Sequence, residues 1–97
     1  MYLFVTFRKI RGIVMLFMIT QVHTPQTCPK DEGEADVLID KNAQGVSVKG
    51  RWGAWSHHII WYLVEADSLD AIQRFVDPGM KRCTCTIEPV GETPIQR

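Results

Sequence analysis

The sequence predicts an α+β fold, with strands and helices in the order β-α-β-β-α-β and a four-stranded antiparallel sheet. The first observation is that residues 13–19 and 59–64 are apolar on both parities, which indicates strands covered on both faces. The second is that residues 46–55 and 82–90 alternate polar and apolar side chains, as edge strands with one wetter face do. The order of the elements and the hydrophobic pattern therefore predict the same sheet independently.

The first strand is expected over residues 13–22, where β-branched and bulky side chains suit a buried strand. This apolar stretch is too short to span a bilayer and no small-residue cleavage site follows it, so we expect neither a targeting signal nor a membrane partner. Residues 1–12 are predicted to be an N-terminal extension, with Met15 as a natural alternative first residue. The predicted domain covers residues 13–90, and residues 91–97 form a C-terminal tail.

A first helix is expected over residues 31–42. Asp31 is placed to cap its first turn with Glu34 three residues later, acidic side chains crowd the positive end of the helix dipole, and Gly45 follows the end. Gly33 weakens this helix by about 1 kcal/mol relative to alanine. With few apolar residues to pack, it is the least stable element that the sequence predicts.

The second strand is expected over residues 46–55. Its two parities carry different side chains: Val46, Val48 and Trp52 on one, and Ser47, Lys49 and Arg51 on the other. Gly50 and Gly53 lie inside it, and a glycine within a strand commonly marks a bulge or the close approach of another backbone.

The remaining elements follow in short succession. A turn leads to a third strand over residues 58–66, and Ser68 then caps a second helix over residues 69–77, which has an apolar stripe at helical spacing. A Pro-Gly pair ends the helix. The fourth strand is expected over residues 82–90.

This order of elements is the split, ferredoxin-like arrangement. Right-handed crossovers are expected to place the first and third strands side by side and parallel at the centre, with the second and fourth strands at the edges. A chain of 97 residues has helices for only one face of that sheet. We therefore expect a second copy to cover the other face and the protein to form a homodimer.

Composition excludes several classes of partner. Eleven basic and eleven acidic residues cancel, which removes the positive field that gathers nucleic acid, so no nucleic-acid partner is expected. Three cysteines without framework spacing fit a reducing interior, and we expect a cytoplasmic location. The chain has no glycine-rich phosphate loop and no dinucleotide fingerprint, so no cofactor is expected.

One cluster has the residue types of a metal site: His23, Cys28, Cys83 and Cys85. The first strand is expected to end where the antiparallel fourth strand begins, and the Cys-x-Cys spacing puts both thiols on one strand face. A zinc site would need three or four such ligands. The spacing matches no zinc-finger pattern, and the favoured interpretation is that these cysteines are small buried hydrophobic residues that bind no metal.

His57 and His58 are expected at the hairpin, at the end of the sheet opposite His23. Histidine acts as a general base near neutral pH, so His23 and His58 are the candidate catalytic residues. The alternative is a solvent-facing turn histidine followed by a strand residue.

The aromatic group comprises Trp52, Trp55, Trp61 and Tyr62. Trp52, Trp55 and Tyr62 are the candidate ligand-binding residues of an apolar cavity between sheet and helices. Trp52 and Trp55 have opposite parity, and a bulge at Gly53 would bring both to one pocket. The favoured alternative is that these aromatic side chains fill the core or a subunit interface.

The chain also resembles a known superfamily. The segment Met15-Leu-Phe-Met-Ile-Thr-Gln-Val-His-Thr-Pro25, the Cys28-Pro29 beyond it and the Leu63-Val-Glu-Ala-Asp67 before the second helix are similar to a small bacterial family of unknown function within the dimeric α/β-barrel superfamily. The likeness covers residues 15–90. It implies ferredoxin-like subunits that pair through their sheets, and members that are cofactor-free monooxygenases or isomerases, or stress-responsive proteins. No catalytic motif is matched residue by residue.

Three functions remain open at this point. The first is a small binding protein, stress-linked in the family it resembles, that holds an apolar or aromatic molecule between sheet and helices. The second is a cofactor-free monooxygenase or isomerase that uses a histidine base. The third is a dimeric interaction module without a small-molecule site.

Overall fold

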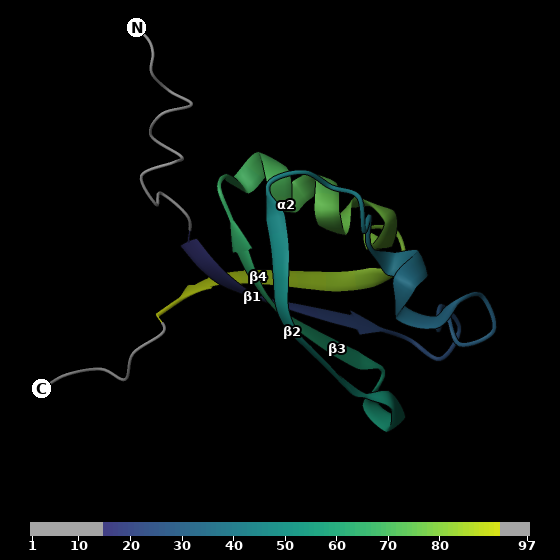
Figure 1. The fold of residues 1–97 in the computed structure, drawn as a ribbon. Helices are drawn as coiled ribbons and strands as arrows, with labels where there is room; N and C mark the ends of the chain where they lie inside the picture. Colours follow the sequence, from purple (N-terminus) through teal and green to yellow (C-terminus); the bar gives the residue numbers. More distant parts are fainter. Residues whose placement is uncertain (1–14, 92–97) are drawn as a thin grey trace, which may run out of the picture.

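The computed structural model describes residues 15–91, so the predicted extension of residues 1–12 and nearly all of the predicted tail lie outside the described residues. Within this part the elements follow in the order β1 (Met15–His23), the 3-10 helix η1 (Glu34–Leu38), β2 (Val46–Ala54), η2 (Trp55–His57), β3 (Ile59–Ala66), α2 (Leu69–Val76), η3 (Asp77–Gly79) and β4 (Cys83–Val90) (Figure 1). Residues 13 and 14 of the predicted first strand lie outside the described residues, and the other predicted strand boundaries agree with these to within one residue.

The four strands form one antiparallel sheet in the order β2-β3-β1-β4. The predicted antiparallel sheet and the predicted edge strands are confirmed. The prediction that the two central strands run parallel is wrong, because Met15 lies opposite Ala66 and Val22 opposite Ile59. A crossover returns the chain parallel to the strand it left, and a hairpin then joins β2 to β3, so β3 must run antiparallel to β1.

The predicted first helix over residues 31–42 is corrected to the five-residue 3-10 helix η1. Gly33 precedes it in the left-handed conformation, with φ 107°, and no side chain caps its first turn. The chain after η1 is held instead by Asp40, whose backbone N–H donates to the Phe75 carbonyl at 2.8 Å. Residues 15–91 thus form an α+β fold with a four-stranded antiparallel sheet and one α-helix.

Helix α2 forms as the sequence predicts. The Ser68 hydroxyl accepts a hydrogen bond from the Ala71 backbone N–H at 3.1 Å, which caps the first turn. Its buried side chains face the sheet, and Figure 1 shows α2 and η1 on the same side of the strands. The core between the layers consists of Phe17, Ile19, Ile39, Tyr62, Val64, Ala66, Ile72, Phe75 and Val76.

The sheet face away from α2 carries a second set of apolar side chains. On the central strands Met18 lies opposite Leu63 and Thr20 opposite Trp61, and all four side chains are only partly buried. Within residues 15–91 the α-helix therefore covers one face of the sheet and leaves this open face with its apolar residues partly accessible.

The pairing of β2 with β3 shifts by one residue between Val48 and Gly50. The extra residue there changes the parity of everything beyond it, so that Arg51 lies opposite Tyr62 and Trp52 lies opposite Trp61. The predicted common face of Val48 and Trp52 is therefore wrong. Arg51 joins the face that carries α2, and Trp52 joins the open face.

Candidate functional site

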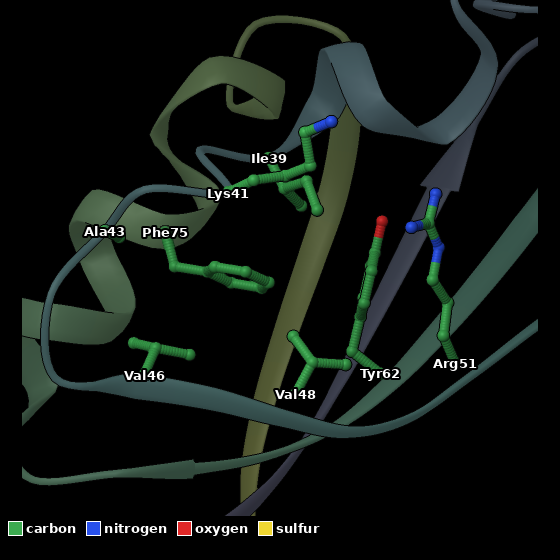
Figure 2. A pocket seen from close by; sticks show the side chains of 8 residues that line it. All are labelled: Ile39, Lys41, Ala43, Val46, Val48, Arg51, Tyr62 and Phe75. Atoms are coloured by element: carbon green, nitrogen blue, oxygen red, sulfur yellow. The ribbon is translucent and has the colours of Figure 1, made fainter.

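A cavity of about 220 Å³ opens between the sheet and the layer of α2 and η1. It is lined by side chains from β2, β3, α2 and the segment after η1, shown in Figure 2: Ile39, Lys41, Ala43, Val46, Val48, Arg51, Tyr62 and Phe75. Six of these eight are apolar or aromatic, and two are cationic. Concave sites with an apolar wall and few polar groups bind small molecules, and at about 220 Å³ this cavity is smaller than the roughly 300–1,000 Å³ of pockets for drug-sized ligands.

Tyr62 is the central polar group of the cavity. The side chain is buried on β3 and packs edge to face against Phe75, with ring centroids 5.6 Å apart. Its buried hydroxyl has no hydrogen-bond partner within residues 15–91. Burial raises the pKa of Tyr62 to about 12, against the opposing effect of the nearby Arg51 cation. The hydroxyl therefore keeps its proton and is a hydrogen-bond donor near neutral pH.

Two cations and one carboxylate lie at the same end of the cavity. Arg51 Nη2 donates to Asp36 Oδ1 at 2.8 Å, and Lys41 Nζ donates to Asp36 Oδ2 at 3.3 Å. These two hydrogen bonds lower the pKa of the Asp36 carboxyl, which stays ionised. Figure 2 shows the Arg51 and Lys41 head groups and the Tyr62 hydroxyl directed toward one end of the cavity. That end is net positive, because two cations share a single carboxylate.

The three predicted ligand-binding residues lie in different places. Tyr62 lines the cavity. Trp52 is 55% exposed on the open face, and Trp55 is 85% exposed in η2. The register of β2 shifts before Gly50 and shows no further shift at Gly53, so Trp52 and Trp55 do not meet in one pocket.

The cationic residues Arg51 and Lys41 were missed by sequence reasoning. The sequence signal for the bulge that turns Arg51 toward the cavity is Gly50, because a glycine inside a strand often marks a bulge. Gly53 lies in the same strand and gives the same signal, so the sequence does not show which glycine marks the bulge. The helix predicted over residues 31–42 does not reach Lys41, which lies instead in a turn after η1 where the Ala43 backbone N–H donates to the Asp40 carbonyl at 3.1 Å.

The candidate catalytic residues His23 and His58 lie together. The His23 backbone N–H donates to the His58 carbonyl at 3.0 Å, and the two imidazole rings meet edge to face with centroids 5.1 Å apart. The prediction that they occupy opposite ends of the sheet is wrong, because antiparallel pairing brings the end of β1 to the start of β3. Burial, then the neighbouring His58 and Arg82, lower the pKa of His23. His57 is exposed in η2.

The three cysteines of the predicted metal cluster are free thiols. Two of them, Cys28 and Cys83, lie near the two histidines. Cys83 lies opposite His23, which confirms the predicted meeting of the first and fourth strands. Its Sγ donates to the Gly79 carbonyl at 3.1 Å. Burial raises the pKa of the Cys85 thiol to about 11. Cys28, by contrast, groups with His23 and His58, and the ligand atoms of these three residues lie within 4.8 Å of one another.

These features define a small α+β protein with a four-stranded antiparallel sheet, one α-helix in its described part and a cavity between the two layers. Residues 15–94 match the family described as a domain of unknown function, DUF3303, and the chain belongs to that family. No curated protein and no solved structure matches the chain. Across residues 15–91 none of the helices has the length and apolar character needed to cross a membrane.

Proposed function

We propose that this protein binds a small molecule with an aromatic or apolar body and an anionic group in the cavity between sheet and helix. The observation that carries the proposal is the buried Tyr62 hydroxyl, which has no partner within residues 15–91. The Arg51 guanidinium lies over the ring of the same tyrosine, with Cζ 5.6 Å from the ring centroid. An unpaired buried polar group costs about 1–3 kcal/mol. A ligand acceptor at this position would recover that energy.

The charges at the cavity favour an anionic group over a neutral one. Arg51 uses one of its five N–H donors on Asp36, so others remain for a ligand carboxylate or phosphate. The side chains of Phe75, Val46 and Val48 form the apolar wall that would hold the body of the ligand. Neither His23 nor His58 lines this cavity, so the proposal is binding and not catalysis.

We assign the fold to the ferredoxin-like class and to the dimeric α/β-barrel superfamily as part of the same proposal. The strand order β2-β3-β1-β4 supports it, with two crossovers that each skip one strand. A 3-10 helix stands where that fold has its first α-helix. The shorter segment leaves the cavity above Tyr62 less covered than a full helix would.

The partner we propose for the open face is a second copy of this chain. Trp61, Leu63 and Met18 lie on the central strands of that face, where contiguous apolar surface marks an interaction site. The same face carries a cation, Lys49, and an anion, Glu65, whose side chains lie 3.8 Å apart. Mixed charge of this kind is self-complementary across a two-fold axis, as an isologous dimer requires.

Binding is tested with a matched panel of small aromatic carboxylates and the corresponding neutral aromatic alcohols, followed by two-dimensional NMR of the backbone amides. The carboxylates are expected to shift amides of β2, β3 and the segment after η1, and the alcohols to bind more weakly. Tyr62→Phe and Arg51→Gln are each expected to weaken binding about 10-fold, which is about 1.4 kcal/mol. Trp52→Phe, on the opposite face, is the control and should bind normally.

Shifts confined to the open face, or carboxylate affinities unchanged in both cavity variants, would contradict the proposed site. Tryptophan fluorescence is not the chosen signal, since Trp52, Trp55 and Trp61 do not line the cavity.

A further inference from the structure

His23 and His58 leave two buried nitrogen atoms without partners. The Nδ1 atoms of both rings are shielded from solvent and have no hydrogen-bond partner within residues 15–91. His23 is only 7% exposed as a whole. Buried polar atoms are nearly always paired, so an unpaired one calls for an explanation such as an ion that the site binds.

Cys28 is held beside these rings by an ordered turn. The backbone N–H of Thr24 donates to the Thr27 hydroxyl at 2.9 Å, and the Thr27 N–H donates to the Thr24 carbonyl at 3.1 Å. Arg82 Nη2 donates to the Thr27 carbonyl at 2.9 Å and fastens this turn to the start of β4. The thiol therefore reaches the histidines on a fixed backbone, which is what a site needs to bind without large rearrangement.

His58 adopts an unusual backbone conformation. It is the sole residue other than glycine with positive φ in residues 15–91, at φ 59° and ψ 43°. Non-glycine residues in this left-handed region are uncommon and carry strain, which is found more often at functional sites. Here the conformation ends η2 and starts β3 at the point where the His58 ring meets the His23 ring.

We propose that His23, Cys28 and His58 bind one Zn²⁺ ion, with a fourth coordination position left for water or a small ligand. The ligand atoms of the three residues lie within 4.8 Å of one another. Tetrahedral zinc with bond lengths of about 2.0–2.3 Å places its ligand atoms about 3.3–3.6 Å apart. The ligand atoms that lie farthest apart thus need to approach one another by about 1.2–1.5 Å, which rotations about the side-chain χ angles supply.

The donor types select the metal. Two imidazole nitrogens and one thiolate form a borderline-soft set that suits zinc, whereas calcium and magnesium require oxygen ligands. Three protein ligands with an open position are the arrangement of reactive zinc sites, in contrast to the four closed ligands of structural ones.

Cys83 and Cys85 are not part of the proposed set. Cys83 already donates its thiol hydrogen to the Gly79 carbonyl, and the compact group comprises His23, Cys28 and His58 alone among the described residues. None of these three lines the cavity proposed for the organic ligand, so the two proposals succeed or fail separately.

The test is titration of the metal-free full chain with Co²⁺, which takes the place of zinc and reports its ligands in the absorption spectrum. We expect one Co²⁺ per chain, a tetrahedral visible band and a thiolate-to-cobalt charge-transfer band, and displacement of cobalt by added Zn²⁺. Cys28→Ser should abolish the charge-transfer band. His58→Asn, which keeps a residue that tolerates positive φ, should weaken zinc binding by more than about 10-fold, since even outer-shell changes cost that much.

Two matched controls lie next to the site. His57→Asn changes an exposed neighbouring histidine and should bind zinc like the wild type, and Cys85→Ser should leave the charge-transfer band intact. Far-ultraviolet circular dichroism of each variant confirms that it is folded. A wild type without a charge-transfer band, a band that survives Cys28→Ser, or equal loss of affinity in His57→Asn and His58→Asn would overturn the proposal.

Discussion

At the scale of single residues, Gly45 shows how a backbone conformation fixes the start of a strand. It has φ +86°, and its carbonyl accepts a hydrogen bond from the Asp67 backbone N–H at 3.1 Å. A Cβ added there would lie 2.7 Å from Asp67 Oδ1 and 3.1 Å from the Ala71 Cβ. The position therefore needs glycine both for its conformation and for its space.

Gly45→Ala is expected to lower the free energy of unfolding by about 1–3 kcal/mol, because alanine is strained at positive φ and meets its neighbours. Gly53→Ala is the matched control, since its Cβ would lie 3.8 Å from the nearest atom, the Ile59 carbonyl oxygen. Urea denaturation of both variants measures the difference. Equal stability of the two variants would show that Gly45 is not constrained in this way.

The ionisation of Cys85 and Tyr62 makes the free energy of unfolding depend on pH in the alkaline range. Burial raises the pKa of Cys85 from 9.0 to about 11 and that of Tyr62 from 10.0 to about 12. The folded state holds both protons more tightly than the unfolded chain does. Their contribution is therefore fully present below pH 9 and is lost as pH rises through about 11 for Cys85 and about 12 for Tyr62.

The free energy of unfolding is thus expected to fall between pH 9 and about pH 11 in the wild type. Cys85→Ala should show a smaller fall over the same range, because it removes the thiol that titrates. Denaturation curves at a series of pH values measure both slopes. A slope unaltered by the substitution would mean that Cys85 ionises equally easily in the folded and unfolded chain.

At the scale of elements, Arg82 couples the turn that carries Cys28 to β4. Its guanidinium donates to both carboxylate oxygens of Glu32, at 2.9 and 3.0 Å, and to the Thr27 carbonyl at 2.9 Å. The hydrogen bonds from Arg82 lower the pKa of Glu32. Glu32 also balances a cation that would otherwise repel a metal ion at the neighbouring histidines.

Arg82→Gln is expected to weaken zinc binding about 10-fold without abolishing it, because it frees the turn that positions Cys28 but removes no ligand. The cobalt charge-transfer band should persist at saturating metal, which separates a positioning role from ligation. Competition with a colorimetric chelator gives the affinity. Arg74→Gln, on the exposed side of α2, is the control, and an Arg82 variant that binds like it would contradict the positioning role.

The positions of most helices and strands along the chain are predictable from the sequence. The relative direction of the two central strands is not. Alternation, apolar runs and the Ser68 cap give the strands and α2 nearly at their observed bounds. The contact between His23 and His58 was missed because it depends on the relative direction of β1 and β3, which periodicity does not report. The helix predicted over residues 31–42 reduces to η1, where Gly33 takes a left-handed conformation and tertiary contacts such as that of Asp40 replace capping.

At the scale of the whole molecule, the two faces of the sheet differ in how they are covered. Phe17, Ile19 and Val64 are buried beneath the helix layer, whereas Trp61 and Leu63, on the same central strands, are partly accessible on the open face. The central strands have apolar residues on both parities, which predicts that both faces of the sheet are covered. Within residues 15–91, the α-helix covers one of these faces. The proposed second copy would cover the other face, and so would explain why the central strands are apolar on that side as well.

Trp61→Lys is the substitution that tests the dimer. A lysine at the centre of the open face would place two like charges near the proposed two-fold axis and remove a large aromatic contact, so we expect dimer affinity to fall by about 2–4 kcal/mol, or about 30-fold to 1000-fold. Leu69→Lys is the control, because Leu69 is 63% exposed on α2, away from this face. Native mass spectrometry and sedimentation equilibrium measure subunit number for the wild type and both variants. A wild type that stays monomeric at micromolar concentration, or a Trp61→Lys variant as dimeric as Leu69→Lys, would show that a second copy does not cover the open face.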